Sequence, residues 1–551
     1  MEVTKIKDIF LCPVRKELAR LISLEDREPF SKTHGCFDRT YWGWKFTDFP
    51  GPRYQEAVYA LAYIFKKSIE GNSFVNSEKI LKWASAGLNY WKNLQHANGS
   101  FDEAYPMEQS LAATAFTSFY LGEAFFMLSE DLTNSEKNIL RSTFSKAGSW
   151  LCCNDERHGV LSNHLSAAAV ALYVIFHITG ETRFEQRAQY FLNRIYESQS
   201  KEGWYEEYGG VDIGYQTHTT FYLSRLWQYT QDDDLLESLK RSISFFKFFV
   251  HPNGTVGGDY CSRNTEFYMP AGFEILAPVC HDAAQISKFM RQSIKKQTGV
   301  GLETMDFQNF MPLLNNYLFA AEYSKILGNV EESLPFQQEG EWDFPDAGLV
   351  VKSNSYYYAI LAPSKGGVIK IYDCKKRKLH LSDCGYWIKL KKGDIASNQV
   401  LRRLRKIQRN GKEVSVSSFF KEINQQTLSP FRFILFRLFS ITFGRVKPVA
   451  YWLKNLLVKT LVINSRSLPI QLLRKVNFLE KEIEISDEIK LTGNIDIDLI
   501  QPEARFTSIH MGSSRYFCAQ EMNSKSLKEE GLLKDLLKNR IVRIDRNYKF
   551  K

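Results

Sequence analysis

The chain has 551 residues and a mass of 63.9 kDa, a length that allows about two to four domains. Charged residues make up 24% and hydrophobic residues 44%, which excludes a largely disordered chain. No uninterrupted apolar run reaches the roughly 18 residues of a membrane-spanning helix, so we expect no conventional transmembrane segment. Aromatic residues make up 14%, which indicates large cores, binding surfaces built from rings, or both.

The charge is divided unevenly along the chain. Residues 1–340 carry 33 Lys and Arg against 41 Asp and Glu, a net charge of −8. Residues 341–551 carry 39 against 21, a net charge of +18. This division predicts two physically different modules, and the basic one could face phosphate, lipid headgroups or an anionic polymer.

The cysteines and the N-terminal residues indicate the cellular compartment of the protein. The nine cysteines are odd in number, and none has the spacing of a zinc site. We therefore expect reduced thiols, no metal and no cofactor. The N-terminal residues show neither the apolar core nor the cleavage site of a signal peptide. These features predict a cytoplasmic protein, which could also lie peripherally on the inner membrane.

The first 340 residues have the periodicity of helices. Apolar residues recur every three or four positions, and turn residues such as Asn98-Gly99 and Thr179-Gly180 separate the segments. Helix starts lie about 20–30 residues apart without a strict repeat, which favours irregular helical hairpins over a repeat array. We predict an (α/α) toroid over 1–340 whose inner helices and loops line a cleft. The predicted helices are 53–69, 77–94, 107–128, 135–150, 161–179, 183–199, 216–230, 233–250 and 310–327.

The pattern changes near residue 340 to short β-rich runs bounded by turn residues. We predict an antiparallel β-sandwich over 341–551, so the fold class is α+β with two domains. A basic apolar insertion lies around 401–460. The predicted strands are 348–352, 356–361, 368–372, 386–390, 414–420, 457–463, 475–478, 483–485 and 495–500.

Two groups of polar residues lie where predicted helices begin. Asp102, Glu103 and Tyr105 share a loop. They either form a sugar-binding group, or one of the two carboxylates caps the next helix. Asn163 and His164 open a strongly apolar helix. They are either capping and structural residues, or donors for an anion at the positive end of the helix dipole.

Two further segments carry candidate binding residues. Residues 203–216 hold four Gly, three Tyr, one Trp and three acids, which suits a sugar site; its candidates are Trp204, Glu206, Glu207, Tyr208 and Tyr215. Downstream, Arg263 and Asn264 could grip a carboxylate. The alternative for Arg263 is an internal ion pair with Glu274.

In this order, the motifs resemble those of the heparinase II/III-like proteins, a polysaccharide-lyase group with an (α/α) toroid followed by a β-sandwich. The resemblance covers most of the chain. Its opening stretch, Asp38-Arg39-Thr40-Tyr41-Trp42, is similar to a subgroup often found with bacterial exopolysaccharide genes. The remaining carriers are the 102–105 loop, Asn163-His164, 207–215 and 263–265.

The resemblance implies roles for individual residues. By position, Asn163 and His164 match the pair that neutralises the uronate carboxylate, and Tyr215 matches the Tyr that protonates the leaving oxygen. Offsetting the carboxylate charge makes the C5 proton more acidic, and a positioned Tyr can serve as acid or base. The family's His-x-His-x-x-Asp-like run is reduced here to His380 and Asp383. Its loss leaves Tyr215, Tyr208 or Tyr268 as the base, or implies another reaction or none.

Residues 431–459 combine large apolar side chains with six basic residues and no acid. They form either an interfacial segment on an anionic membrane or an insertion that covers the sheet with its Arg and Lys stems. No nucleic-acid motif accompanies the charge, so we expect no nucleic-acid partner.

The hypothesis favoured by the sequence is β-elimination on an acidic, uronate-containing polysaccharide. A glycoside hydrolase that uses Asp102, Glu206 or Glu207 as a carboxylate pair is one alternative. A polysaccharide-binding or exopolysaccharide-assembly protein with a decayed lyase site is the other.

Overall fold

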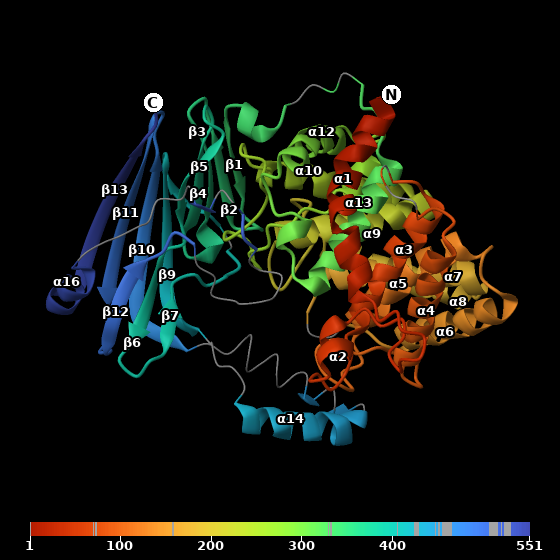
Figure 1. Cartoon of the computed structure of the whole chain (residues 1–551). Helices are drawn as coiled ribbons and strands as arrows, with labels where there is room; N and C mark the ends of the chain where they lie inside the picture. The colour runs from red at the N-terminus through yellow and green to blue at the C-terminus, as the bar shows by residue number, and fades with distance from the viewer. Residues whose placement is uncertain are drawn as a thin grey trace.

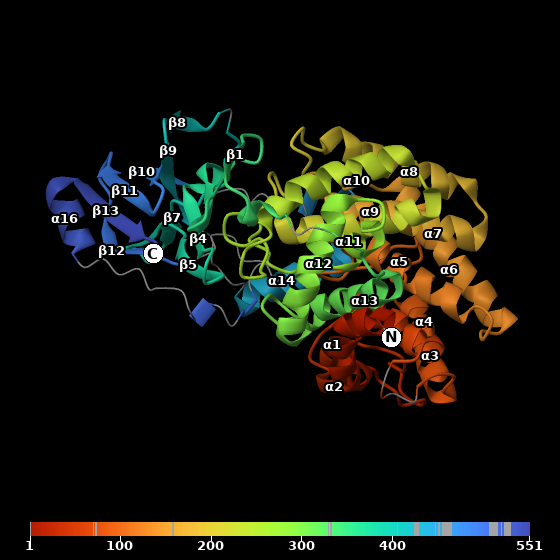
Figure 2. The same cartoon turned by 90° about the horizontal axis from the view of Figure 1, so that it is seen from above.

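The computed structural model describes residues 2–69, 71, 74–156, 159–328, 330, 333–404, 406–423, 429–446, 448–449, 452–453, 466–505, 516–518, 521–522 and 531–551. Helices fill the first part of the chain and strands most of the second, and the two parts lie side by side (Figures 1 and 2). The expected α+β fold class, a toroid followed by an antiparallel sandwich, is confirmed. The predicted strand 457–463 lies outside the described residues.

The helical part is a closed ring of helix pairs. Inner helices contact one another in the order α3, α5, α7, α9, α11, α13 and back to α3, while the helices between them pack outside. The inner helices α5 and α7 are buried nearly all round, whereas the outer helices are amphipathic. The bounds are α1 Glu2–Leu24, α2 Arg39–Trp44, α3 Ala57–Lys66, α4 Glu78–Leu94, α5 Leu111–Leu128, α6 Asn134–Cys153, α7 Ser162–Thr179, α8 Thr182–Ser198, α9 Ile213–Thr230, α10 Asp233–Phe246, α11 Ala271–Leu276, α12 His281–Lys296 and α13 Phe307–Tyr323.

Among the described residues, α5 is the one helix long and apolar enough to cross a membrane. The protein itself buries 89% of that window. Because its neighbours in the ring already cover it, α5 is a core helix of the toroid.

Two antiparallel sheets follow the toroid. The first has the order β1-β2-β3-β4-β5, and the second has the order β12-β6-β7-β9-β10-β11-β13, with β8 paired to β9. The bounds are β1 Gly340–Phe344, β2 Leu349–Ser353, β3 Tyr357–Ala362, β4 Val368–Asp373, β5 Lys378–Asp383, β6 Tyr386–Leu390, β7 Ile395–Ser397, β8 Gln408–Asn410, β9 Glu413–Ile423, β10 Ser467–Phe478, β11 Glu482–Leu491, β12 Ile497–Pro502 and β13 Ile541–Lys549.

Successive side chains of a strand point to opposite faces of its sheet, so each sheet can pack on a different neighbour with each face. One face of the first sheet joins the toroid core through residues such as Val351, Tyr358 and Tyr372. Its other face packs on the second sheet. The short helix α16 (Leu532–Asn539) packs on this same face of the second sheet, at the other end of the strands, against residues such as Ile489 and Ile544. Three layers therefore follow one another: the toroid, the first sheet and the second sheet (Figure 1).

Polar contacts join the first sheet to the toroid. Tyr358 donates from its hydroxyl to the carbonyl of Phe248 at 2.5 Å, and the hydroxyl of Tyr372 lies 2.9 Å from Nδ1 of His251. Lys370 forms ion pairs of 3.3 Å and 3.2 Å with Asp259 and Glu266. The sandwich is thus held rigidly beside the segment that connects α10 to α11.

The basic apolar insertion is a helix, α14 (Pro430–Thr442). It contacts toroid residues, including Asp48 and Tyr105, and Figure 1 shows it apart from both sheets. For the described part of this segment, the alternative that it covers the sheet is therefore wrong.

Candidate active site

The candidate site lies at one end of the toroid. Successive inner helices are joined through an outer helix, so they run in the same direction and their N-terminal ends gather together. Asn163 and His164 open α7, Tyr215 lies in the first turn of α9, Glu103 precedes α5, and Arg263 precedes α11. The positive ends of several helix dipoles meet there, an arrangement that favours a bound anion.

Asn163 and Glu207 form the buried centre of this group. The side-chain amide of Asn163 donates to Oε1 of Glu207 at 2.7 Å, and its backbone N–H donates to Oε2 at 3.3 Å. Glu207 thus caps α7 from a segment 44 residues away. Burial raises the pKa of Glu207 to about 7, although His164 and Asn163 oppose the shift. This carboxyl can therefore gain or lose a proton near neutral pH.

His164 lies beside this pair with a carboxylate partner of its own. Its Nδ1 is 2.9 Å from Oε2 of Glu156, and its ring meets the edge of Phe116. Burial alone would lower the pKa of His164, but the hydrogen bond and the charges of Glu156, Glu207 and Glu103 raise it. The imidazole is therefore biased toward its cationic form.

Arg263 and Tyr208 form the opposite part of the group. The guanidinium carbon of Arg263 lies 3.2 Å from the centroid of the Tyr208 ring, a cation–π contact. The arginine is 2% exposed, and within the described part of the chain its Nε and Nη1 have no hydrogen-bond partner. Glu274 pairs instead with Arg291 at 3.0 Å, so the predicted Arg263–Glu274 ion pair is wrong.

Asp212 joins the start of α9 to the segment that carries Arg263. As the N-cap of α9 it accepts the backbone N–H of Tyr215 at 3.2 Å, and it also accepts those of Arg263 and Thr265. Burial raises the pKa of Asp212, while these hydrogen bonds lower it. Tyr215 therefore stands in the first helical turn and not in a glycine-rich loop. Its ring lies 6.3 Å from that of Tyr208.

Several other predicted binding residues hold the structure around the site. The carboxylate of Asp102 accepts from two backbone N–H groups of its own loop, while Ser110 caps α5, so the capping alternative for Asp102 is wrong. Trp204 is buried and donates to Glu202 at 3.1 Å. Further contacts pair Glu206 with Arg403, Asn264 with Lys365, and Tyr105 with Phe436. Their roles in substrate binding stay predictions.

Further residues that face the site were not predicted from the sequence; they come from the short 3-10 helix Pro52–Glu56 before α3, from α5 and from α9. Arg53 stacks over Phe116 at 4.6 Å and approaches Glu103 at 3.4 Å. His218 and Tyr222 stack on the same phenylalanine. Burial, together with the charges of Arg53 and His164, holds the pKa of His218 well below its usual range. The sequence signal that could have identified His218 and Tyr222 is their spacing: they lie four residues apart and therefore on one face of a predicted helix.

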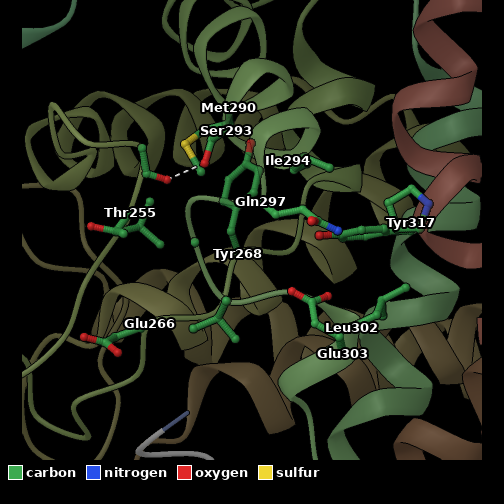
Figure 3. A pocket seen from close by; sticks show the side chains of 16 residues that line it. Thr255, Glu266, Tyr268, Met290, Ser293, Ile294, Gln297, Leu302, Glu303 and Tyr317 are labelled. Carbon is green, nitrogen blue, oxygen red and sulfur yellow. Dashed lines mark hydrogen bonds between the residues drawn. The ribbon is translucent and has the colours of Figure 1, made fainter. Parts of the chain in front are cut away.

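Three predicted residues lie elsewhere. His380 is half-buried in the sandwich and packs on Phe550 at 4.7 Å, while Asp383 is fully buried there in an ion pair with Arg474. Tyr268 lines a separate cavity with residues of α12 and α13 such as Ser293 and Tyr317, as Figure 3 shows. Of the three bases considered, Tyr208 and Tyr215 are the ones placed at the toroid end. Among the described residues, no group of three His, Cys, Asp or Glu side chains could hold a metal.

Comparisons with known proteins agree with this architecture. Residues 47–269, which contain most of the site, match the ulvan lyase N-terminal domain family. Xanthan lyase from Paenibacillus has a TM-score of 0.51 and 9% identity over 88% of this chain and 46% of its own. Chondroitin AC lyase from Streptomyces coelicolor A3 has a TM-score of 0.54 and 9% identity over 89% and 67%. No curated protein matches significantly.

The chain therefore has the fold of the heparinase-like polysaccharide lyases, and the predicted resemblance to them is confirmed. It spans less than half of the xanthan lyase structure.

Proposed function

We propose that this protein cleaves an acidic, uronate-containing polysaccharide by β-elimination. The observation that carries the proposal is the convergence of Asn163, His164 and Arg263 at the positive helix ends. Nε and Nη1 of Arg263 have no hydrogen-bond partner among the described residues. Such donors suit a carboxylate and would stabilise the extra negative charge that develops on it when the C5 proton leaves.

Each residue has a part in the proposed reaction. His164 and Asn163 offset the uronate charge, and Arg263 binds the same or a neighbouring acidic group. A bound carboxylate would raise the pKa of Glu207 further, so this residue is neutral in the complex and can donate a hydrogen bond. A tyrosine removes the C5 proton as the C4–O bond breaks, and a C4–C5 double bond forms. Tyr208 is assigned as the base: burial raises its pKa, and the charge of Arg263 opposes that shift and favours the phenolate. Tyr215 is assigned as the acid that protonates the leaving oxygen.

The hydrolase alternative has less support from the geometry. Glu207 has the raised pKa of a general acid. Its expected carboxylate partners are engaged elsewhere: Glu206 pairs with Arg403, and Asp102 holds its own loop. A binding protein without catalysis would use the same anion-binding groups.

The test is incubation with a panel of acidic polymers, starting with ulvan, xanthan and chondroitin sulphate. A lyase generates an unsaturated uronate that absorbs in the ultraviolet, a hydrolase generates reducing ends without that absorbance, and a binder generates neither. Binding of the panel without any cleavage would contradict the lyase proposal and support the binding function.

A further inference from the structure

Helix α14 is formed by ordinary local chemistry but has an unusual surface. Ser429 caps it by accepting the N–H of Arg432 at 3.4 Å, and Pro430 occupies the first turn. The helix lies outside the main body near α2 (Figure 1). Ser440 is the buried residue among those described in α14, so the toroid leaves most of this helix uncovered.

One face of α14 holds it against the toroid. Nε of Arg437 pairs with Asp48 at 3.0 Å, and its guanidinium also lies over the ring of Phe49. The Phe436 ring meets Tyr105 edge-on at 5.1 Å. These contacts orient the helix and leave its opposite face to solvent.

The opposite face is apolar. Its residues are spaced three and four apart and therefore form one stripe along the helix. A surface helix normally turns its polar face to water. Helix α14 instead turns its apolar face to water. The stripe, with the exposed fraction of each residue, is Phe431 (69%), Ile434 (56%), Leu435 (50%) and Leu438 (52%).

The charge around the stripe identifies the partner. Arg432 and Arg445 are exposed beside it. Residues 430–459 of the sequence contain six basic residues and no acid. Trp44 and Phe46, 76% and 91% exposed, precede the Asp48 that anchors Arg437. Bulky apolar side chains flanked by cations suit the boundary between headgroups and acyl chains in an anionic bilayer.

We propose that α14 docks this protein onto an anionic phospholipid surface. The stripe of Phe431, Ile434, Leu435 and Leu438 enters the bilayer interface, and Arg432 and Arg445 contact lipid phosphates. Tyr105, which touches α14, belongs to the loop that supplies Glu103 to the candidate site. Docking would therefore hold the end of the toroid that carries the candidate site near the lipid, where a membrane-associated polymer would meet it. The docking itself does not depend on the proposed reaction.

The experiment measures sedimentation of the full chain with two kinds of vesicle, phosphatidylcholine alone and phosphatidylcholine mixed equally with phosphatidylglycerol. We expect binding to the mixed vesicles, weakened by salt. Phe431→Ser, Leu435→Ser and Leu438→Ser together should weaken it at least 100-fold, since each roughly half-exposed side chain contributes about a tenfold effect. Arg432→Gln with Arg445→Gln should weaken it about fivefold per residue.

The matched control places Ser at Val279, Ile326 and Leu537, which are 44%, 49% and 49% exposed elsewhere on the molecule. It should bind as the parent does, and all variants should keep the parental unfolding temperature. Equal binding to both vesicles, no binding by the parent, or full binding by the triple stripe variant would overturn the proposal. So would a dimer in lipid-free solution that the triple variant abolishes, because a second copy would then cover the stripe.

Discussion

Replacing Glu207 by Gln tests the buried centre of the site directly. Glu207 is 2% exposed and receives two hydrogen bonds from Asn163. Gln keeps the shape of the side chain and one acceptor oxygen, but it cannot ionise. The substitution therefore removes the free-energy cost of ionising a buried carboxyl without opening a cavity.

The magnitude follows from the pKa of Glu207. Burial raises it from 4.5 to about 7, so ionising this carboxyl in the folded protein costs up to about 3 kcal/mol relative to the unfolded chain. Because the folded-state pKa is raised, this group's stabilisation is fully present below pH 4.5. It is lost as the pH rises toward 7, and little changes above that. The variant should show no such loss.

The assay is chemical denaturation of parent and variant across pH 4 to 9, chosen to span both pKa values. We expect the free energy of unfolding of Glu207→Gln, relative to the parent, to rise by about 2–3 kcal/mol between the acidic and alkaline ends. Loss of the second Asn163 bond adds a cost of about 1 kcal/mol that does not depend on pH. Glu206→Gln, beside it but paired with Arg403, is the control. A pH-independent difference for Glu207→Gln would refute the assigned burial.

Three further substitutions test the site and the sandwich. Tyr215→Phe should lower lyase turnover by roughly two to four orders of magnitude with little change in binding, while Tyr190→Phe on an outer helix should leave it unchanged; tolerance of Tyr215→Phe would favour hydrolysis. Asn163→Ala should lower both turnover and stability, because Glu207 loses its donor, and parental turnover would contradict the charge-stabilising role. Arg474→Met removes the buried cation between Asp383 and Asp487 and leaves Arg546 as the arginine that pairs with both, so it should destabilise the sandwich by about 3–5 kcal/mol in thermal or chemical unfolding. An unchanged unfolding midpoint would show that this buried network contributes little.

Local patterns in the sequence were sufficient for most helices of the toroid and for most strands. The apolar period of 161–179 matches α7 (Ser162–Thr179), and 386–390 matches β6. Periodicity is a property of neighbouring residues, so it can be read before the chain folds. The elements that were not predicted are the helices α1, α2, α11, α12, α14 and α16 and the strands β1, β5, β7, β8 and β13.

The pairings that make the site come only from the tertiary structure. Asn163 and Glu207 were both chosen from the sequence, but their hydrogen bond joins segments 44 residues apart. The sequence could not show that Arg263 lacks Glu274 as a partner, because Arg291 arrives from another helix. It also could not decide whether the apolar stripe of α14 faces the sheet or solvent. Residue types and periods are local, whereas burial, charge pairing and the pKa shifts that follow depend on which distant segments the closed ring brings together.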